Sequence, residues 1–473
     1  SPQIESEGNS TFVVWQDNTT GNNEIYLKKS TDGGVTFYEP KQPPKINTQY
    51  PGGPVVSDPN LKVEIVTRGI NFPTHMAFLG NNDLLVLEKN NGTVKRIVDG
   101  RIQNASLLDV AVANGVERGM LGIDVKKTRD GPTFVFLYFT ESLRDGDDVS
   151  SGKVPLGNRL YRYELVNNRL VNPKLLLDLP STPGSAHNGG KVIVGPDGNV
   201  YLSIGDLDRS NAKNASSIIT KAQNHVESQD ADGRAGILRV TVDGQPVNGG
   251  ILGKTGVLNK YFAYGIRNSF GMDFDPLTGK LWDTENGPEY GDEINLVESG
   301  FNSGWNKVQG IWEPNENSFG PIKSNFTDLF DFNGTGHYHP PVLSWYQPPP
   351  GLTAIKFLNS AKMGQQNAND LFVGDFHNGN IYHFKLNANR TGLELESVLG
   401  DKVASNLNET GNVTFARGFG GITDMQVGPD GYLYVLSLYK SADDCTTSHH
   451  SSKPCISYNN PLEGTVFRIR PKA

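Results

Sequence analysis

The chain has 473 residues, which is enough for two or three average domains or for one large repeat domain. Its formal net charge is −8 and its basic residues form no dense patch, so nucleic acid is a poor candidate partner. No stretch approaches the roughly 18 consecutive apolar residues of a membrane-spanning helix. The 54 glycines and 28 prolines favour a turn-rich β protein.

The N-terminal region differs from the rest of the chain. Short β-prone runs occur there, among them Phe12–Trp15, and Ser30–Phe37 resembles the Asp-box turn of sialidase-type propellers, a structural turn to which we give no catalytic role. We expect a β extension over 1–45, a linker containing Pro and Gly over 46–61, and the main domain over 62–473.

One hairpin pattern recurs six times in the main domain. Gly195–Gly198 and Gly428–Gly431 both read Gly-Pro-Asp-Gly, in which Pro presets φ, Asp bonds the local backbone and Gly accepts positive φ. The first strands begin at residues 76, 123, 193, 272, 355 and 425. The pattern predicts an all-β, six-bladed β-propeller with a short N-terminal β (Asp-box-like) extension. A pair of β-sandwiches is the competing fold, and residues 211–227 are the only stretch expected to be helical.

Polar residues precede the inner strands of the predicted blades. In a propeller these strand ends converge on one mouth of the central channel, so the residues are expected to be neighbours. Bases, cations and amides there suit a polar ligand and proton abstraction, although several could merely bond backbone groups at strand ends. The residues are His75, Glu117 with Arg118, His187 with Asn188, Arg267 with Asn268, Thr353, and Arg417 or Thr423.

An acidic segment forms a second candidate site. Five carboxylates lie within the eleven residues 283–293, with Gly and Pro bending the backbone. Carboxylate and carbonyl oxygens in a bent loop favour Ca²⁺, whereas the alternative is a solvated acidic loop.

Four motifs carry a family resemblance. They are Glu117–Gly122, His187–Gly190 with its following hairpin, Tyr264–Asn268 and Glu285–Asn295. Together they resemble the soluble PQQ-dependent glucose/aldose sugar dehydrogenase (glucose/sorbosone dehydrogenase) family, from about residue 62 to 471. The resemblance implies a six-bladed propeller that oxidises an aldose sugar or other small alcohol with a PQQ-like cofactor and Ca²⁺, and passes electrons to an external acceptor.

The resemblance also implies roles for single residues. His187 would take the proton from the sugar hydroxyl, and Arg267 would face the quinone oxygens. Glu117 and Asn268 would hold the edge of the cofactor. The implied metal ligands are the carbonyl groups of Gly287 and Pro288, with Asp292 and Glu293 at positions of a further, structural Ca²⁺.

The sequence departs from the family where PQQ carboxylates are bound. His377 occupies the position of the family's lysine here, and Gly421 and Thr423 occupy the positions of its two arginines. His377 and Thr423 are therefore the side chains expected to contact the cofactor at those positions. Losing charge-assisted contacts of about 1.5–3 kcal/mol each would weaken cofactor binding strongly. The candidate replacements on neighbouring loops are Arg118, Lys356 and Arg417.

Two other functions fit these departures. The first is a non-catalytic propeller that binds a glycan or a surface partner through the same mouth. The second is an enzyme with copper or zinc near His75, His187 and His377, because histidine nitrogens are common ligands of both metals.

Several features predict an exported protein, extracellular or associated with a cell surface. The chain begins Ser1-Pro2-Gln3 without Met, as expected of a mature or trimmed product. Cys445 and Cys455 suit a disulfide, although with His449 and His450 they could also hold a metal. The ten glycosylation sequons are at Asn9, Asn18, Asn91, Asn104, Asn214, Asn325, Asn333, Asn389, Asn408 and Asn412.

Overall fold

The computed structural model divides into two compact units, Ser1–Thr48 and Gln49–Ala473. It describes residues 3–7, 10–17, 24–30, 53–129, 131–146, 154–207, 219–248, 250–314, 319–321, 329–346, 348–406, 409–438 and 463–472. In the first unit, β1 (Gln3–Glu7), β2 (Ser10–Asp17) and β3 (Glu24–Ser30) form an antiparallel sheet in that order.

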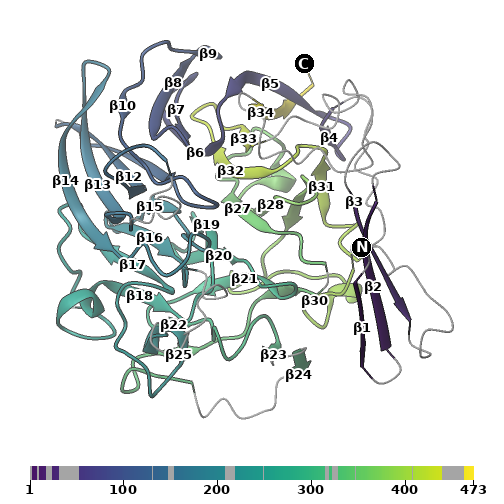
Figure 1. The fold of residues 1–473 in the computed structure, drawn as a ribbon. Coiled ribbons are helices and arrows are strands. Elements are labelled where there is room, and N and C mark those ends of the chain that lie inside the picture. The colour runs from purple at the N-terminus through teal and green to yellow at the C-terminus, as the bar shows by residue number, and fades with distance from the viewer. Residues whose placement is uncertain are drawn as a thin grey trace. The chain divides into compact units, whose positions relative to one another are not determined.

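The second unit is a succession of sheets around a common centre (Figure 1). The first contains β6 (Pro73–Gly80), β7 (Asp83–Glu88), β8 (Thr93–Val98), β9 (Arg101–Ile102) and β10 (Leu108–Asp109). The next contains β11 (Met120–Lys127), β12 (Thr133–Glu141), β13 (Gly157–Val166) and β14 (Arg169–Leu179). It is followed by β15 (Val192–Val194), β16 (Val200–Ile204), β17 (Gly236–Val240) and β18 (Tyr261–Tyr264), extended by β22 (Phe301–Asn302) and β25 (His337–Tyr338).

The later sheets recruit strands from distant parts of the chain. One contains β19 (Ser269–Phe274), β20 (Leu281–Glu285), β21 (Asp292–Val297), β26 (Leu343–Trp345) and β30 (Val403–Ala404). Another contains β27 (Leu352–Phe357), β28 (Leu371–Asp375), β29 (Ile381–Phe384), β31 (Thr414–Arg417) and β4 (Val55–Val56). The last contains β32 (Ile422–Val427), β33 (Leu433–Ser437), β34 (Gly464–Pro471) and β5 (Leu61–Ile70), and β23 (Trp312–Pro314) pairs with β24 (Phe319–Pro321) separately.

Each predicted hairpin is an antiparallel strand pair. The pairs are β6–β7, β11–β12, β15–β16, β19–β20, β27–β28 and β32–β33. The turn chemistry is as expected: Gly198 has φ +81°, and Asp197 Oδ1 accepts the backbone N–H of Asn199 at 3.0 Å. The turn at Gly431 has φ +80°. These tight turns fix the register of the β15–β16 and β32–β33 hairpins.

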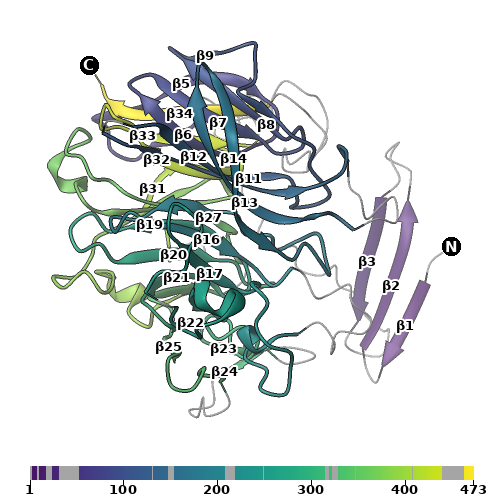
Figure 2. The ribbon, with the colours of Figure 1, turned by 90° about the vertical axis from the view of Figure 1, so that its left-hand side faces the viewer.

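The first strands of the hairpins contact one another in a closed circuit, β6–β11–β15–β19–β27–β32–β6. The circuit is completed where β5, near the start of the second unit, pairs along its length with β34 at the end of the chain. Figures 1 and 2 both place this sheet beside the one that contains β6 and β7. The predicted all-β propeller is therefore confirmed, and a pair of β-sandwiches is excluded.

Helical structure among the described residues is limited to short 3₁₀ turns. These are Lys221–Gln223, Gly256–Lys260, Gln365–Asn367 and Ser397–Leu399. The helix expected over 211–227 is wrong for its described part, where only three residues form a 3₁₀ turn because the segment pairs its backbone with Gln229. No helix in the described ranges is long and apolar enough to cross a membrane.

The apolar side chains of adjacent sheets pack between them. One cluster joins Phe467 of β34 with Phe419, whose rings meet edge to face at 5.3 Å, and includes Phe372 of the preceding sheet. Trp282 and Trp345 anchor the cluster between the β19 and β27 sheets. The predicted disulfide and metal alternatives at Cys445 and Cys455 lie outside the described residues.

The closing sheet provides a test of stability. Phe467 is fully buried, whereas its cross-strand partner Ile65 is 48% exposed. We expect Phe467→Ala to lower the free energy of unfolding by about 3–5 kcal/mol, because it leaves a cavity between sheets. The matched Ile65→Ala change should cost less than about 1 kcal/mol. Urea denaturation measures both, and equal losses would contradict the packing described.

Candidate active site

A cavity of about 760 Å³ opens where the inner strands begin. Among the residues that the structure describes, its lining includes most of the predicted site: His75, Glu117, His187, Arg267, Asn268, Gly287, Pro288, Asp292, Thr353, His377 and Thr423. Glu293 is absent from the lining and lies buried behind it. Arg118 and Asn188 are fully buried, and Arg417 lies on β31 and does not contribute to the lining. The structure thus brings together residues that are up to about 350 positions apart in sequence.

β-Bulges shape the floor of this cavity. Five inner strands shift register at their first residues, and the residues left out of pairing are Thr74 and His75 on β6, Leu121 on β11, Phe270 on β19, Thr353 on β27 and Thr423 on β32. All of them line the cavity. A bulge turns a side chain away from its ordinary alternation, so the same device aims these side chains at the channel mouth.

His187 lies just before β15 in an unusual backbone conformation. Its φ is +55°, a left-handed value that is rare for residues with a side chain. The backbone N–H donates to Glu117 Oε2 at 2.7 Å, which holds this conformation. Gly205 makes the close packing possible, because a Cβ there would lie 2.5 Å from the His187 carbonyl oxygen and 2.4 Å from that of Arg267.

Asp206 orients the His187 ring. The Asp206 carboxylate is buried, and its Oδ1 lies 2.6 Å from Nδ1 of His187, while Oδ2 accepts the indole N–H of Trp305 at 2.8 Å. Burial by itself would raise the pKa of Asp206, but the hydrogen bond and charge of His187, with Arg267 and Trp305, lower it. An ionised carboxylate only accepts hydrogen bonds, so Nδ1 carries a proton, and in the neutral form of the ring Nε2 is the nitrogen with the free lone pair.

Asp206 was missed as a functional residue in the sequence. It lies two residues beyond the end of β16, and in an antiparallel hairpin the second strand ends where the first begins. Its position after Ile204-Gly205 therefore places it at the same mouth as His187. A search for polar residues that precede inner strands does not include residues that follow second strands.

Glu117 and Asn268 tie two walls of the cavity together. Asn268 Nδ2 donates to Glu117 Oε2 at 3.2 Å, and Asn268 Oδ1 accepts the backbone N–H of Gly189 at 3.2 Å. Glu117 Oε2 thus accepts from both Asn268 and the His187 backbone. The predicted base and the predicted cofactor-binding residues form one connected network.

Arg267 binds the loop that follows β20. Its Nη1 donates to the carbonyl oxygens of Asn286 and Gly287, each at 2.8 Å, and its guanidinium carbon lies 5.5 Å from the centre of the Trp305 ring. Its backbone N–H donates to Glu285 at 2.6 Å. Two carbonyl oxygens therefore converge on one cationic nitrogen at the edge of the cavity.

Asp292 and Glu293 have different surroundings. The Asp292 carboxylate accepts backbone N–H groups of Gly287 at 2.9 Å, Gly351 at 2.7 Å and Leu352 at 3.2 Å, which fixes the loop and the start of β27. Glu293 is paired across the strands with Glu285, and both accept from Ser303 Oγ, at 3.1 and 2.6 Å. Burial, with the charge of nearby carboxylates, raises the pKa of Glu293 to about 7 and that of Glu285 well above its usual range.

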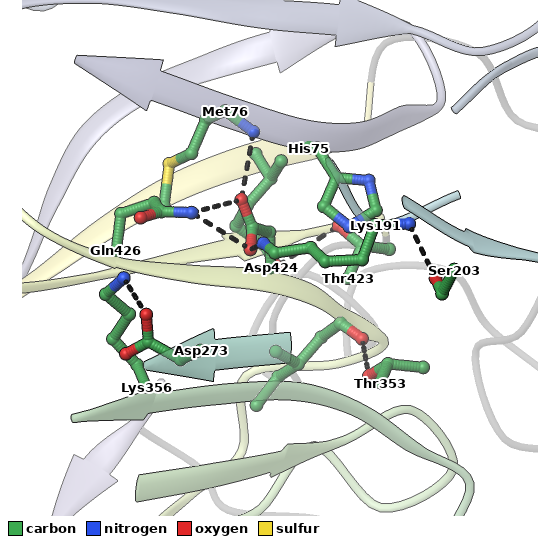
Figure 3. A network of polar contacts seen from close by, with 12 residues as sticks. His75, Met76, Lys191, Ser203, Asp273, Thr353, Lys356, Thr423, Asp424 and Gln426 are labelled. Carbon is green, nitrogen blue, oxygen red and sulfur yellow. Dashed lines mark hydrogen bonds and ion pairs between the residues drawn. The ribbon is translucent and has the colours of Figure 1, made fainter. Parts of the chain in front are cut away.

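A buried ion-pair network lies beneath the floor (Figure 3). Lys191 Nζ lies 2.5 Å from Asp424 Oδ1, and Asp424 Oδ2 accepts the backbone N–H of Met76 at 3.0 Å. A second pair, Lys356 with Asp273 at 2.8 Å, lies close by. Each of these cations is therefore balanced by a carboxylate, and none of the four residues belongs to the described lining of the cavity.

The prediction that Arg118, Lys356 or Arg417 supplies the missing positive charge in the cavity is wrong. Arg118 donates from Nη2 to the carbonyl oxygens of Ser181 and Gly184, and Lys356 pairs with Asp273. Neither these two nor Arg417 belongs to the described lining. Among the lining residues that the structure describes, the lysines and arginines are Lys89 and Arg267.

The histidines give no support to the copper or zinc alternative. His377 is exposed and its Nδ1 lies 3.0 Å from the Pro349 carbonyl oxygen, whereas His75 is buried with Nδ1 against the Leu121 carbonyl oxygen. Within the described ranges no group of three His, Cys, Asp or Glu side chains is placed to hold a metal ion.

His75 makes the stability of the fold depend on pH. Burial, helped by the charge of Lys191, lowers the pKa of His75 to about 4 from 6.5. As pH falls, the unfolded chain therefore binds a proton on this histidine before the folded protein does. The free energy of unfolding should decrease by about 1.4 kcal/mol for each pKa unit of this difference as pH falls from about 6.5 to 4. Urea denaturation across this range should show a smaller loss for His75→Gln. If the free energy of unfolding fell equally with pH in the wild type and in His75→Gln, a neutral His75 in the folded protein would be contradicted.

Comparisons with known proteins agree with this architecture. The aldose sugar dehydrogenase of Escherichia coli strain K12 is 26% identical over 389 residues, covering 81% of this chain and 91% of that protein. Quinoprotein glucose dehydrogenase B of Acinetobacter calcoaceticus is 27% identical over 263 residues, 53% of each chain. The PQQ-bound aldose sugar dehydrogenase of Streptomyces coelicolor has a similar fold, with a TM-score of 0.56 at 20% identity, covering 88% of this chain and all of that one. The sequence model described as Glucose / Sorbosone dehydrogenase matches residues 70–443, and the chain belongs to this family of oxidoreductases.

Proposed function

We propose that this protein is an exported quinoprotein dehydrogenase, built on six blades, that oxidises an aldose sugar or another small alcohol with PQQ and Ca²⁺. The observation that carries the proposal is the His187–Asp206 pair, which presents an imidazole lone pair beside Arg267 in a cavity. The blade count is supported by the circuit of inner strands. The family, through relatives named as sugar dehydrogenases, supports the reaction.

The cavity fits the shape and chemistry of PQQ. Its volume of about 760 Å³ accommodates a flat tricyclic molecule, and its lining includes the aromatic rings of Phe72, Phe270 and Phe376. Arg267, Asn268 and Lys89 provide hydrogen-bond donors for quinone and carboxylate oxygens. When bound, PQQ would accept the hydride from the carbon of the sugar hydroxyl. His377 and Thr423 would contact its edge from neighbouring sheets.

His187 would act as general base. Because Asp206 fixes the proton on Nδ1, Nε2 is the atom that takes the proton from the substrate hydroxyl. Asp206 then stabilises the imidazolium that forms, as a buried carboxylate does for a catalytic histidine in general. The left-handed backbone at His187, held by Glu117, keeps the ring in place during this transfer.

Arg267 would supply positive charge where negative charge develops on the reacting oxygens. Its partners, the Asn286 and Gly287 carbonyls and the Trp305 ring, hold the guanidinium at the cavity edge. Glu117 and Asn268 would fix the cofactor edge through the network that already joins them.

Ca²⁺ would bind at the loop after β20. The loop carbonyls of Asn286 and Gly287 already bind a cationic group, and Pro288 adds a third carbonyl beside them. Asp292 lies next to this loop and bonds the Gly287 amide. Glu293, which shares Ser303 with Glu285, is the candidate carboxylate of a further structural Ca²⁺.

Export is part of the same proposal. The sequons within the described ranges, at Asn91, Asn104, Asn333, Asn389 and Asn412, are all exposed. An external electron acceptor, a position at the cell surface and a Cys445–Cys455 disulfide would suit that location. Counting reactive thiols before and after reduction tests the disulfide, and two free thiols in the native protein would contradict it.

Reconstitution tests the function directly. Purified protein is mixed with PQQ and Ca²⁺, and reduction of a dye is followed with a panel of aldoses and alcohols. We expect dye reduction that needs a sugar or alcohol and PQQ, and that falls when Ca²⁺ is removed with EGTA. Absence of both dye reduction and bound quinone absorbance would refute the proposal. A molecule that binds glycans without reducing the dye would instead be the non-catalytic propeller.

Substitutions of His187 and Asp206 distinguish PQQ binding from catalysis. His187→Ala should abolish turnover, and Asp206→Asn should lower kcat by about 10²- to 10⁴-fold, because the ring loses its fixed tautomer. Both variants should bind PQQ as the wild type does. Asp230→Asn is the matched control, since Asp230 is an exposed carboxylate outside the cavity that pairs with Lys221. Lost PQQ binding in His187→Ala, or full activity in Asp206→Asn, would contradict these roles.

A further inference from the structure

Val116 has a backbone conformation that valine disfavours. Its φ is +52°, in the left-handed region, where a branched Cβ crowds the adjacent backbone. Among the residues that the structure describes, it is the only β-branched residue with a positive φ, whereas many of the others are asparagines. Glycine or asparagine would adopt this φ at little cost. A valine here therefore strains the fold, and such strain is concentrated at functional sites.

Hydrogen bonds around Val116 impose this conformation. The Arg118 N–H donates to the Gly115 carbonyl at 2.9 Å, which closes a tight turn with Val116 at its second position. The N–H of Glu117 donates to the Ser185 carbonyl at 3.1 Å, which ties the turn to the segment that leads into the proposed base. The backbone at Val116 therefore cannot relax without the loss of these bonds.

The fold gains little from the side chain of Val116. This residue is 70% exposed, so it buries only a small part of its surface against the rest of the protein. Val116 nevertheless belongs to the described lining of the cavity. The next residue, Glu117, accepts the backbone N–H of His187 at 2.7 Å. The turn thus presents an exposed apolar residue at the cavity, beside the loop that carries His187.

The substrate is the molecule that would cover this apolar residue. Its reacting hydroxyl must lie within hydrogen-bond distance of His187 Nε2, so the neighbouring carbons lie near the loop that carries His187. A sugar presents C–H groups as well as hydroxyls. C–H groups gain from contact with an isopropyl group, whereas a hydroxyl pressed against it loses its hydrogen bonds to water. Val116 is therefore suited to distinguish substrates by the groups near the oxidised carbon.

We propose that Val116 determines substrate specificity by contacting C–H groups of the sugar or alcohol near the carbon that is oxidised. It favours substrates that carry hydrogen rather than a hydroxyl at that contact, such as deoxy sugars and alcohols with an alkyl chain. The inference rests on the proposed function, because it takes His187 as the base. The strain at Val116 is then the consequence of holding an apolar group at the cavity.

Steady-state dye reduction by protein loaded with PQQ and Ca²⁺ tests this inference, with an aldose or polyol that the wild type oxidises and with its deoxy forms. Val116→Gly should raise KM by about fivefold to twentyfold at unchanged kcat, because it removes a contact shared by the ground and transition states. Val116→Asn should lower the ratio of kcat/KM for a deoxy form to that for the parent by about tenfold, since its amide can bond a hydroxyl. Val398→Asn is the matched control, because Val398 is an exposed valine outside the described lining.

Thermal melting and PQQ titration calorimetry complete the test. Neither variant of Val116 should melt at a lower temperature or bind PQQ more weakly, because glycine and asparagine adopt the left-handed φ readily. A clear fall in melting temperature in both variants assigns Val116 to the fold, and weaker PQQ binding assigns it to the cofactor. Either result, or an unchanged KM in Val116→Gly, overturns the inference and leaves the proposed function intact. If the wild type reduces no dye with any sugar or alcohol, the proposed function is refuted and the inference fails with it.

Discussion

Antiparallel pairing of β5 with β34 joins the two ends of the second unit in one sheet. This pairing closes the circuit of inner strands, and the closed circuit brings their first residues to one channel mouth. Residues as distant in sequence as Lys89 and His377 line one cavity for this reason. The Lys191–Asp424 pair is buried next to the lining residue His75, where an unpaired charge would be costly, and the Lys356–Asp273 pair is partly buried.

The candidate site depends on hydrogen bonds at the end of the β15–β16 sheet and on others that join this sheet to its two neighbours. Asp206 of the β16 end accepts from Trp305 and holds His187, while its backbone N–H donates to the Arg267 carbonyl at 3.0 Å. Glu117 then links His187 to Asn268. The proposed base, the Arg267 backbone and the proposed cofactor-edge residues Glu117 and Asn268 thus share one network, so their relative positions are fixed before any ligand binds. Such preorganisation lowers the reorganisation needed during proton transfer.

Much of this arrangement could be predicted from hairpin motifs, because the Gly-Pro-Asp-Gly turns and alternating strands are local signals. His187, Arg267 and Thr423 were found because they precede or begin inner strands. Asp206 was missed because it follows a second strand, whose end meets the same mouth only once the hairpin is folded. The prediction that Arg118 and Lys356 replace the missing cations in the cavity was wrong. The sequence does not reveal that carbonyl groups already bind Arg118 and that Asp273 already binds Lys356. The bulges that aim His75 and Thr353 depend on pairing register, which the motifs do not specify.

In the proposed reaction His187, oriented by Asp206, takes a proton from a sugar while a bound quinone is reduced. Rapid mixing of PQQ-loaded protein with an aldose under anaerobic conditions, followed by the absorbance of the cofactor, measures that step without an external acceptor. We expect the wild type to reduce one equivalent of bound PQQ in a single turnover, whereas His187→Ala retains oxidised PQQ. Equal rates of cofactor reduction in the two proteins would contradict it.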